Sequence, residues 1–385
     1  MRLVRIRCEM MEKCMQRFKG TIGRICLSLI SLIITLSLAE AVLRAIDYDA
    51  FFDLNNGRAL FLQPSQNSDV KYELVPGSSG YSWKIQVEIN AQGHRGQMAS
   101  PGAYAGFRTI VLGDSITFGN FLPVEATYAH QMQVMLDKSA SEYEILNFGI
   151  GGYDILQDVA LMKYRGLTYK PDLVLVGFCL NDVGIAGQNL QYIERVQQYA
   201  SNPILSTSRL AQFVVQKVDR KRIALWMEQK NTLEVFAKDY QGRIAPIADD
   251  EQDLRTLMSR LPEEYPSNWY KSELKVGRLR YAFEQLATMA ENEKFSVVVL
   301  IFPWLVGNAD VYPHQVAHEI VRLESDRVGF DVVDVVQDFL ATGMENLRIN
   351  EGDAVHPNEK GHRIVAEKMV RYVRDVRQVN FIKEH

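Results

Sequence analysis

The serine of a Gly-Asp-Ser turn is the first residue in this chain whose setting can support chemistry. Ser115 lies in "VLGDSITFGN" (111–120), where a short apolar run ends and small residues follow. A serine hydroxyl is a weak nucleophile unless a neighbouring base takes its proton. Serine also caps helices at turns of this kind, so the tripeptide by itself leaves both interpretations open.

A base with an orienting carboxylate lies near the C-terminus, in "GDAVHPN" (352–358). Asp353 and His356 are three residues apart, a spacing that can bring the carboxylate to one imidazole nitrogen while the other faces a third group. Pro357 restricts the backbone of His356 to extended conformations. The alternative is a polar turn before the last helix, which Asn358 can cap.

Two further stretches offer groups that can stabilise a negatively charged oxygen. Glycines follow one another in "NFGIGGYD" (147–154), where a backbone N–H can approach a substrate oxygen closely. Asn181, in "GFCLND" (177–182), can donate from its side-chain amide, a contribution worth roughly a hundred- to a thousandfold in rate. The alternatives are a tight strand-to-helix turn and an Asn-Asp turn.

The elements that must position these residues follow an alternating pattern. Five apolar runs predict strands at 108–114, 143–149, 172–178, 295–304 and 330–336, and helical periodicity predicts helices at 127–139, 155–167 and 359–376. Strands that are apolar on both faces, alternating with helices, indicate a parallel sheet covered on both sides. The carboxyl ends of such strands share one edge, so the set predicts an acyl-transfer site there.

At these four stretches the chain resembles the SGNH/GDSL hydrolase family. The blocks are Ser115 in "GDSITFG", Gly152 in "NFGIGGY", Asn181 in "ND" and His356 in "DAVHPN", in the family's order, and the resemblance covers about residues 106–375. It implies an α/β fold, a three-layer α/β/α flavodoxin-like sandwich with a five-stranded parallel sheet, and a serine ester hydrolase of the carboxylesterase or acetylesterase class.

The resemblance also implies a role for each residue. Ser115 is the nucleophile, His356 the base and Asp353 the group that orients His356. The N–H groups of Ser115 and Gly152 and the side chain of Asn181 form the oxyanion hole. No metal or other cofactor is implied.

The chain departs from the family pattern at two positions. Ile116 stands where the family name has leucine, and Cys179 stands where the third block, Gly-x-Asn-Asp, has its glycine; Leu180 precedes Asn181. These changes bear on substrate fit rather than on the donors. The choice of Gly152 among the neighbouring glycines rests on counting from Asn147.

The first 45 residues differ from the rest of the chain. A basic leader precedes an uncharged apolar run, Ile25–Ala39, and residues 20–43 are long enough to span a membrane. Basic residues before the span predict a single-pass anchor with its N-terminus in the cytoplasm and the bulk outside. The alternatives are a signal peptide cleaved after the A-x-A sequence Ala39-Glu40-Ala41, so that the product starts near Val42, and a buried or interfacial helix.

The bulk composition excludes some classes of protein. The chain has 385 residues, 47% of them hydrophobic, and a formal net charge of −4, which argues against a nucleic-acid-binding protein. Three of the four cysteines lie in the first 45 residues. Cys179 alone follows them, so no intrachain disulfide is expected in the exported part.

Three regions are predicted along the chain. After the anchor (1–45), residues 46–105 form an irregular or β-rich linker, with "YSWKIQVEIN" (81–90) as a strand. Residues 106–375 form the hydrolase domain. A helical insertion at about 185–290 is either a lid, an interaction surface or a solvated excursion.

Two further short motifs give weaker signals. "HQVAH" (314–318) has the histidine spacing of a zinc helix but lacks its glutamate, so no metal is predicted. "INAQGHRGQ" (89–97) resembles a short element upstream of the first block in membrane-anchored members of the family, with a glycine-rich turn as the alternative.

These observations predict a membrane-anchored serine esterase that acts outside the cytoplasmic membrane through an acyl-serine intermediate. The resemblance to anchored members implies O-acyl, especially acetyl, esters of cell-surface polysaccharide as substrate, with lipid esters second. An O-acyltransferase of the same fold and a non-catalytic carbohydrate-binding subunit of an envelope polysaccharide assembly remain alternatives. A nucleotide binder is disfavoured because no phosphate loop is present.

Overall fold

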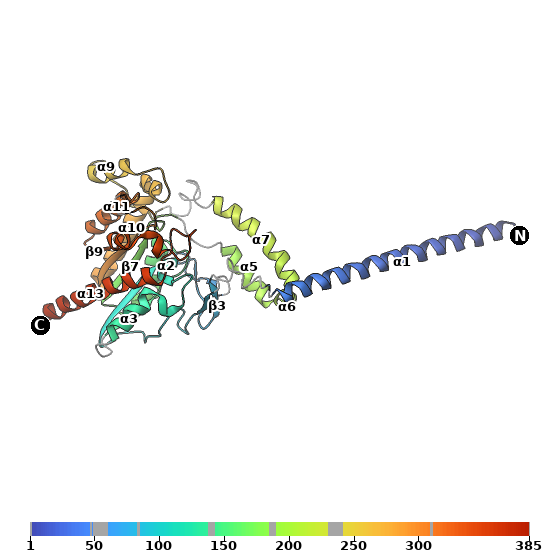
Figure 1. The fold of residues 1–385 in the computed structure, drawn as a ribbon, viewed down its shortest axis with the longest axis horizontal. Coiled ribbons are helices and arrows are strands. Elements are labelled where there is room, and N and C mark those ends of the chain that lie inside the picture. The colour runs from blue at the N-terminus through green and yellow to red at the C-terminus, as the bar shows by residue number, and fades with distance from the viewer. Residues whose placement is uncertain are drawn as a thin grey trace. The chain divides into compact units, whose positions relative to one another are not determined.

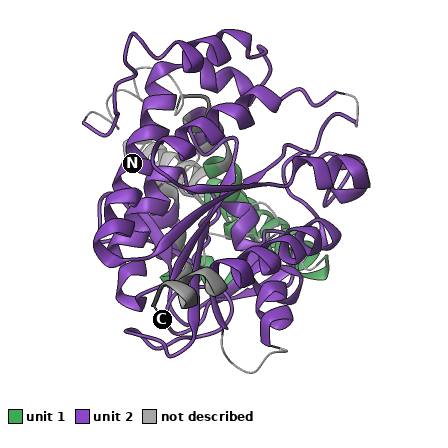
Figure 2. Cartoon of the chain, turned by 90° about the vertical axis from the view of Figure 1, so that its left-hand side faces the viewer, with its two compact units in different colours: residues 1–50, 199–219 green, residues 51–198, 220–385 purple. Residues whose placement is uncertain are grey.

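The computed structural model describes residues 2–46, 48, 61–82, 85–137, 143–184, 190–229, 242–308 and 311–384. The chain divides into two compact units (Figure 2). The first unit comprises residues 1–50 and 199–219, and the second comprises residues 51–198 and 220–385.

The second unit is built on a five-stranded, entirely parallel sheet (Figure 1). Its strands are β5 (Phe107–Gly113), β6 (Tyr143–Asn147), β7 (Leu173–Cys179), β8 (Ser296–Phe302) and β9 (Asp331–Asp334). The strand order is β6-β5-β7-β8-β9, so all five predicted strands are present and the parallel sheet is confirmed. The order reverses between β5 and β7, the place where ligands bind in sheets of this topology.

Helices cover both faces of this sheet. On one face lie α3 (Tyr128–Asp137), α12 (Val336–Thr342) and α13 (Glu359–Glu384); on the other lie α4 (Ile155–Tyr164), α10 (Glu273–Glu293) and α11 (Gln315–Arg327), with α9 (Gln252–Arg260) against α11. The remaining helical segments are α2 (Ser115–Phe118), η2 (Val124–Ala126), η3 (Gly166–Tyr169), η4 (Ser267–Lys271), η5 (Met344–Leu347) and α5 (Leu190–Ser201). The predicted three-layer α/β/α sandwich is confirmed.

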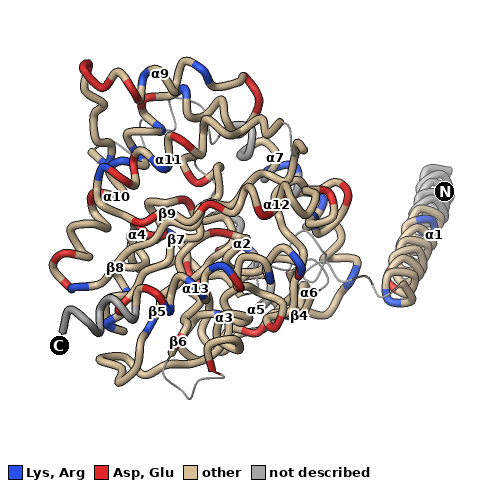
Figure 3. Tube along the Cα trace, turned by 60° about the vertical axis from the view of Figure 1, so that its left-hand side comes forward, with Lys and Arg blue, Asp and Glu red and all other residues tan. Residues whose placement is uncertain are grey.

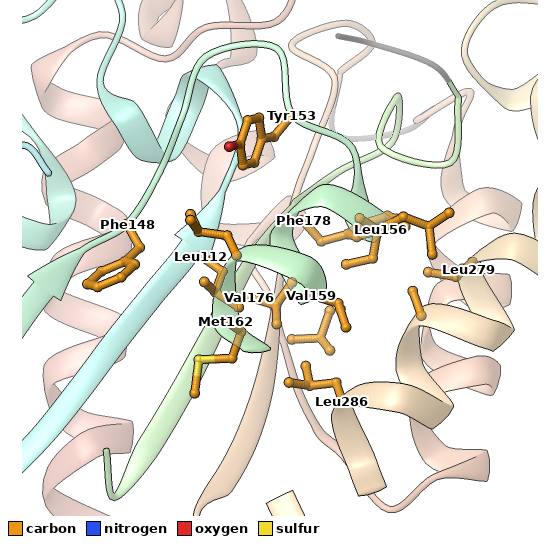
Figure 4. Packing of buried hydrophobic residues seen from close by; sticks show 14 of the residues in the cluster. Leu112, Phe148, Tyr153, Leu156, Val159, Met162, Val176, Phe178, Leu279 and Leu286 are labelled. Carbon is orange, nitrogen blue, oxygen red and sulfur yellow. The ribbon is translucent and has the colours of Figure 1, made fainter. Parts of the chain in front are cut away.

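The pleat of the strands divides the core into two halves. Leu112 and Val176 face α4 and α10, where Val159 and Leu286 pack against them (Figure 4). Val111, the residue before Leu112 in β5, faces the opposite layer of helices. Each fully buried aliphatic side chain contributes about 1.5–3 kcal/mol, so both halves of the core stabilise the sheet.

Two small hairpins precede the sheet. β1 (Leu62–Pro64) pairs antiparallel with β2 (Tyr72–Leu74), and β3 (Ser79–Ser82) pairs antiparallel with β4 (Ile85–Glu88). The prediction of one strand over 81–90 is therefore wrong, since Ser82 lies opposite Ile85. Polar and apolar residues alternate on both sides of this turn, and no Gly, Pro or Asn marks it.

One helix of the predicted insertion belongs to the sandwich. α10 begins inside the predicted insertion and ends just after it, but it packs against α4 and β8 as part of the crossover between β7 and β8 that two parallel strands require. The division of the chain at 45 and 105 stays a prediction. Figure 3 shows basic and acidic residues intermixed along the elements of the second unit.

The first unit contains α1 (Arg2–Ala45), α6 (Pro203–Thr207) and the start of α7 (Arg209–Gln229). Within α1, Lys19–Ala45 is long and apolar enough to cross a membrane, with a mean hydropathy of 2.3 over its most apolar window. Within this stretch the uncharged run Ile25–Ala39 lies between Arg24 and Glu40.

Candidate active site

Ser115 stands at a sharp turn between β5 and α2. The Asp114 carboxylate caps α2 by accepting the N–H of Ile116 at 2.9 Å. Gly113 has φ +144°, and a Cβ there would lie 2.3 Å from Thr117 Oγ1 and 2.5 Å from the Gly177 carbonyl oxygen. Glycine is therefore needed at 113, because β5 and β7 approach closely just before the serine.

The structure brings Ser115, His356 and Asp353 into one hydrogen-bonded chain. Ser115 Oγ lies 2.8 Å from His356 Nε2, and His356 Nδ1 lies 2.8 Å from Asp353 Oδ2. The other carboxylate oxygen, Asp353 Oδ1, accepts the N–H groups of Val355 at 2.8 Å and His356 at 2.9 Å. With its Nδ1 proton held by the carboxylate, the imidazole presents the Nε2 lone pair to the serine hydroxyl.

The environment keeps Asp353 ionised. Partial burial by itself would raise the pKa of this carboxyl, but the hydrogen bonds from His356 and the N–H of Val355 outweigh burial, so the pKa is lowered. The Phe121 ring lies 4.9 Å from the imidazole, centroid to centroid, at a tilt of 58°. Phe121 has φ +69°, a left-handed conformation that a side chain adopts only where its surroundings enforce it.

Gly152 and Asn181 lie in the loops that follow β6 and β7. The first loop is tied to β5, since the Ile150 N–H donates to the Gly113 carbonyl at 3.0 Å. Gly152 has φ +84°, and no hydrogen bond from its N–H is found among the described residues. Asn181 Oδ1 is buried with no partner in the described part of the chain. Both groups are thus uncommitted at the edge where the serine stands.

Buried carboxyls lie beneath this edge. Asp158 accepts the Gly113 N–H at 3.2 Å, and Asp182 accepts the Cys179 N–H at 2.7 Å. Burial, together with the Asp114 carboxyl, raises the pKa values of Asp158 and Asp182 far above the usual range. These raised pKa values favour the uncharged form of both carboxyls beneath a site where an oxyanion would form.

A buried arginine holds the loop that follows the serine. Arg95 donates to the carbonyl oxygens of Phe118 at 2.8 Å, Gly119 at 2.7 Å and Leu122 at 2.6 Å. Burial lowers its pKa to about 10, so the guanidinium keeps its charge at neutral pH. The sequence pointed to the element 89–97 without giving it a role, and Arg95 supplies one.

The same element is organised by Asn90. Its amide nitrogen donates to the carbonyl oxygens of Gly96 at 3.2 Å and Gln97 at 3.1 Å, and its oxygen accepts the N–H groups of Gln92 and His94. The loop so formed points Arg95 at the end of α2. The glycine-rich turn weighed as an alternative is therefore a support for the serine loop.

A second buried arginine holds the loop after β7, and the sequence did not signal it. Arg278 on α10 donates to the carbonyl oxygens of Val183 at 2.8 Å and Gly184 at 2.7 Å. Its guanidinium also lies 2.6 Å from the Asp154 carboxylate, with both side chains fully buried. In "RLRYAFEQ" the residue has the appearance of a surface charge on an amphipathic helix.

The histidines of "HQVAH" serve packing. His318 lies 3.0 Å from the Asp334 carboxylate and 3.1 Å from the Tyr312 hydroxyl, and His314 lies 2.8 Å from the Ser267 hydroxyl. Among the residues that the structure describes, no group of three or more His, Cys, Asp or Glu could hold a metal ion.

Several solved structures are similar to the chain at low identity. An α/β hydrolase enzyme from the metagenome of Lake Arreo, Spain, is 14% identical with a TM-score of 0.41 over 70% of this chain and 95% of that one. An acetyl xylan esterase is 20% identical with a TM-score of 0.39, over 69% and 100%. An acetylxylan esterase from Geobacillus stearothermophilus is 16% identical with a TM-score of 0.39, over 70% and 94%.

Comparison by sequence is more specific. No curated protein sequence matches the chain. A family model described as "GDSL-like Lipase/Acylhydrolase family" matches residues 111–364, a stretch that begins in β5 and ends in α13. Since this match spans well over half of the chain, the protein belongs to the GDSL-like lipase/acylhydrolase family and is a serine ester hydrolase.

Proposed function

We propose that Ser115 is the nucleophile, His356 the general base and Asp353 the orienting carboxylate of a membrane-anchored esterase. The chain of 2.8 Å contacts from Ser115 Oγ through His356 to Asp353 is the observation that carries this proposal. Ser115 is 8% exposed, enough for its hydroxyl to meet an ester carbonyl from outside.

The reaction runs in two halves. Ser115 Oγ attacks the ester carbonyl carbon while His356 Nε2 takes the hydroxyl proton, and the imidazolium is stabilised by Asp353. His356 then protonates the leaving alcohol oxygen as the C–O bond breaks, leaving an acyl-serine. Water, deprotonated by His356, attacks this ester, and the carboxylic acid leaves as Ser115 regains its proton.

The oxyanion of each tetrahedral intermediate needs donors at the same sheet edge. We assign this role to the N–H groups of Ser115 and Gly152 and to the Asn181 amide. The uncommitted state of the Gly152 N–H supports the assignment, since a donor already bonded elsewhere would have to be freed first. Replacing Asn181 with alanine should lower kcat roughly a hundredfold.

For the substrate, the proposal names O-acetyl esters of a cell-surface polysaccharide, reached from a single-pass anchor with its N-terminus in the cytoplasm. Lys19–Ala45 supports the anchor by length and hydropathy. An aromatic group supports a saccharide: Tyr265 is 46% exposed and lies edge-to-face between Trp269 and Trp304. Aromatic rings of this kind pack against the apolar faces of sugar rings.

The aromatic group is connected to the proposed acid–base loop. The residue after Trp304, Leu305, donates its N–H to the Ala354 carbonyl at 2.7 Å, between Asp353 and His356 in the chain. A saccharide held on the Tyr265 ring would therefore lie near the loop that carries the base.

The test of the catalytic residues uses the full chain in mild detergent with an aryl acetate. Ser115→Ala and His356→Ala should each lower kcat/KM roughly 10⁴-fold or more, because the members of such a triad act as one unit. Ser259→Ala, at an exposed serine on α9, is the matched control and should keep wild-type turnover. Wild-type turnover by Ser115→Ala would end the assignment.

The test of the substrate uses O-acetylated polysaccharide beside the same aryl acetate. Tyr265→Ala should lower kcat/KM for the polysaccharide about tenfold and leave the aryl acetate unchanged, whereas Tyr265→Phe keeps the ring and both activities. Equal loss on both substrates would count against a saccharide site at Tyr265.

A further inference from the structure

A glutamate on α1 fixes the start of α7. Glu40 accepts the Ser208 hydroxyl at 3.0 Å and the N–H groups of Arg209 at 3.0 Å and Leu210 at 2.8 Å. These groups are the first donors of α7, which need an acceptor at a helix N-terminus. Figure 1 shows α6 and the start of α7 beside the C-terminal end of α1, and these segments belong to one unit.

The position of Glu40 along α1 sets the level at which α7 begins. Glu40 is the first charged residue after the uncharged run Ile25–Ala39. A helix needs about 20 apolar residues to cross the hydrocarbon of a bilayer, so the stretch from about residue 20 to Ala39 suffices. The start of α7 therefore lies where α1 leaves the hydrocarbon.

A helix on a water-facing surface exposes polar residues and buries apolar ones, and α6 and the start of α7 show the reverse. The exposed residues include an apolar stripe, and the buried positions of α7 are polar. The apolar stripe is Ile204 (69% exposed), Val214 (54%) and Val218 (47%), and the buried polar residues are Gln212 (2%), Gln216 (7%) and Asp219 (3%).

On α7 the two valines lie opposite the two glutamines. Val214 and Val218 are four residues apart and share a face, whereas Gln212 and Gln216 share the face about half a turn away. The buried face is satisfied inside the unit: Gln212 donates to the Leu205 carbonyl at 2.7 Å, and the Tyr48 hydroxyl bonds Gln216. The polar side chains thus leave the apolar stripe facing outward.

We infer that the apolar stripe lies against the lipid bilayer at its interface, so that α6 and the start of α7 form a second membrane contact beside the anchor. Lipid is the occupant because the Glu40 contacts hold the start of α7, the helix that carries Val214 and Val218, at the end of the proposed span. Lys217, exposed beside the stripe, suits anionic headgroups. The inference rests on the anchor of the proposed function and adds to it.

The experiment places a single fluorescent probe on the full chain in vesicles. Cys8, Cys14 and Cys26 are replaced by alanine and buried Cys179 is kept, after which Val214→Cys and Val218→Cys are labelled with an environment-sensitive dye. The vesicles contain phosphatidylcholine and phosphatidylglycerol, with or without lipids that carry a nitroxide at a shallow or a deep acyl position. Aryl acetate turnover is measured on every variant to check folding.

The expected result is quenching at the stripe and none at a control. The shallow nitroxide should remove about half of the dye intensity at positions 214 and 218. Ser259→Cys, on exposed α9 of the second unit, is the matched control and should lose less than about a tenth. Soluble iodide should quench the dye at 259 and spare the dyes on the stripe.

Two outcomes would overturn the inference. Dyes at 214 and 218 that are open to iodide and untouched by the shallow nitroxide would show the stripe in water. Dyes shielded from both quenchers would show that protein, such as a second copy of the chain, covers it.

A separate reference distinguishes failure of the anchor from failure of this inference. Leu32→Cys, in the middle of the proposed span, should be quenched by the deep nitroxide. If Leu32→Cys is unquenched while the stripe is quenched, the spanning anchor is wrong and the interfacial contact stands.

Discussion

Two loops of the candidate site are each held by a buried arginine, but the two arginines are satisfied differently. Arg95 donates to three carbonyl oxygens at the end of α2, and no carboxylate of the described residues lies within ion-pair distance of it. Arg278 donates to two carbonyl oxygens after Asn181 and also pairs with buried Asp154.

The difference shows two ways to keep a charge inside a protein. The carbonyl oxygens of Phe118, Gly119 and Leu122 accept hydrogen bonds from the Arg95 guanidinium, so its N–H groups are satisfied without a counterion. The Arg278–Asp154 pair brings two charges out of water, which is costly to assemble and more costly to break. We therefore expect the stability of the loop after β7 to depend on the Arg278–Asp154 ion pair, and that of the serine loop to depend on the hydrogen bonds from Arg95 to carbonyl oxygens.

The largest expected effect comes from breaking the pair. Arg278→Met should destabilise the protein by about 3–5 kcal/mol, because it leaves the buried Asp154 carboxylate without its counterion. The double variant Arg278→Met/Asp154→Asn should recover much of this loss, since it removes the uncompensated charge while the amide oxygen can still accept the Gln157 N–H that caps α4. Thermal unfolding of the full chain in detergent measures both. A double variant as unstable as the single one would show that the carbonyl contacts matter more than the pair.

The second effect concerns Arg95, whose partners are carbonyl oxygens rather than a carboxylate. Arg95→Met should lower the free energy of unfolding by about 2–3 kcal/mol, because three carbonyl oxygens are left without donors. It should also lower kcat roughly a hundredfold, because the loop that carries Phe121 would move and the His356 imidazole would lose its position against that ring. Arg95→Lys keeps the charge and part of the bonding, so it should recover part of kcat. A stable Arg95→Met variant with wild-type kcat would show that α2 needs no such support.

The sandwich was readable from the sequence because its signals are local. The runs at 108–114 and 172–178 are apolar on both faces, which is the mark of a buried parallel strand. The hairpin of β3 and β4 was missed because a period of two continues through its turn. Apolar periodicity reports burial and does not report where a chain reverses.

The candidate site was predictable for the same kind of reason, up to a limit. The three-residue spacing of Asp353 and His356 and the Gly-Asp-Ser turn at Ser115 are local patterns that predict these residues as a base, its carboxylate and a nucleophile. Arg95 and Arg278 do not, because a charged residue is most often exposed and only tertiary packing turns these two inward. The sequence can single out a segment such as 89–97, but it does not show that Arg95 is the residue of that segment that holds the serine loop.

The two loops should also respond differently to pH. His94 belongs to the element of Arg95, and burial, with the nearby Arg165 charge, lowers its pKa to about 4 from 6.5. Between these values the unfolded chain binds a proton that the folded chain does not, so stability falls as the pH falls from 6.5 toward 4. At pH 5 the loss should be about 2 kcal/mol.

The measurement compares unfolding at pH 7 and pH 5 for the wild type and His94→Phe, which keeps the stack on Phe148. The variant should lose less stability on acidification than the wild type, whatever its stability at pH 7. Equal losses in both proteins would show that His94 does not carry this part of the acid sensitivity.

The smallest expected effect is on the other loop and has the opposite sign. Burial raises the pKa of Asp182, so the folded chain keeps a proton that the unfolded chain releases once the pH exceeds its ordinary value of 3.8. The contribution of Asp182 to the free energy of unfolding therefore falls as the pH rises above 3.8. Asp182→Asn is neutral at every pH and still accepts the Cys179 N–H, so it should change stability by less than about 1 kcal/mol at pH 5 and flatten the decline toward pH 8. A steeper decline would mean that Asp182 is ionised in the folded protein, and the loop after β7 would then hold a second buried charge beside the Arg278–Asp154 pair.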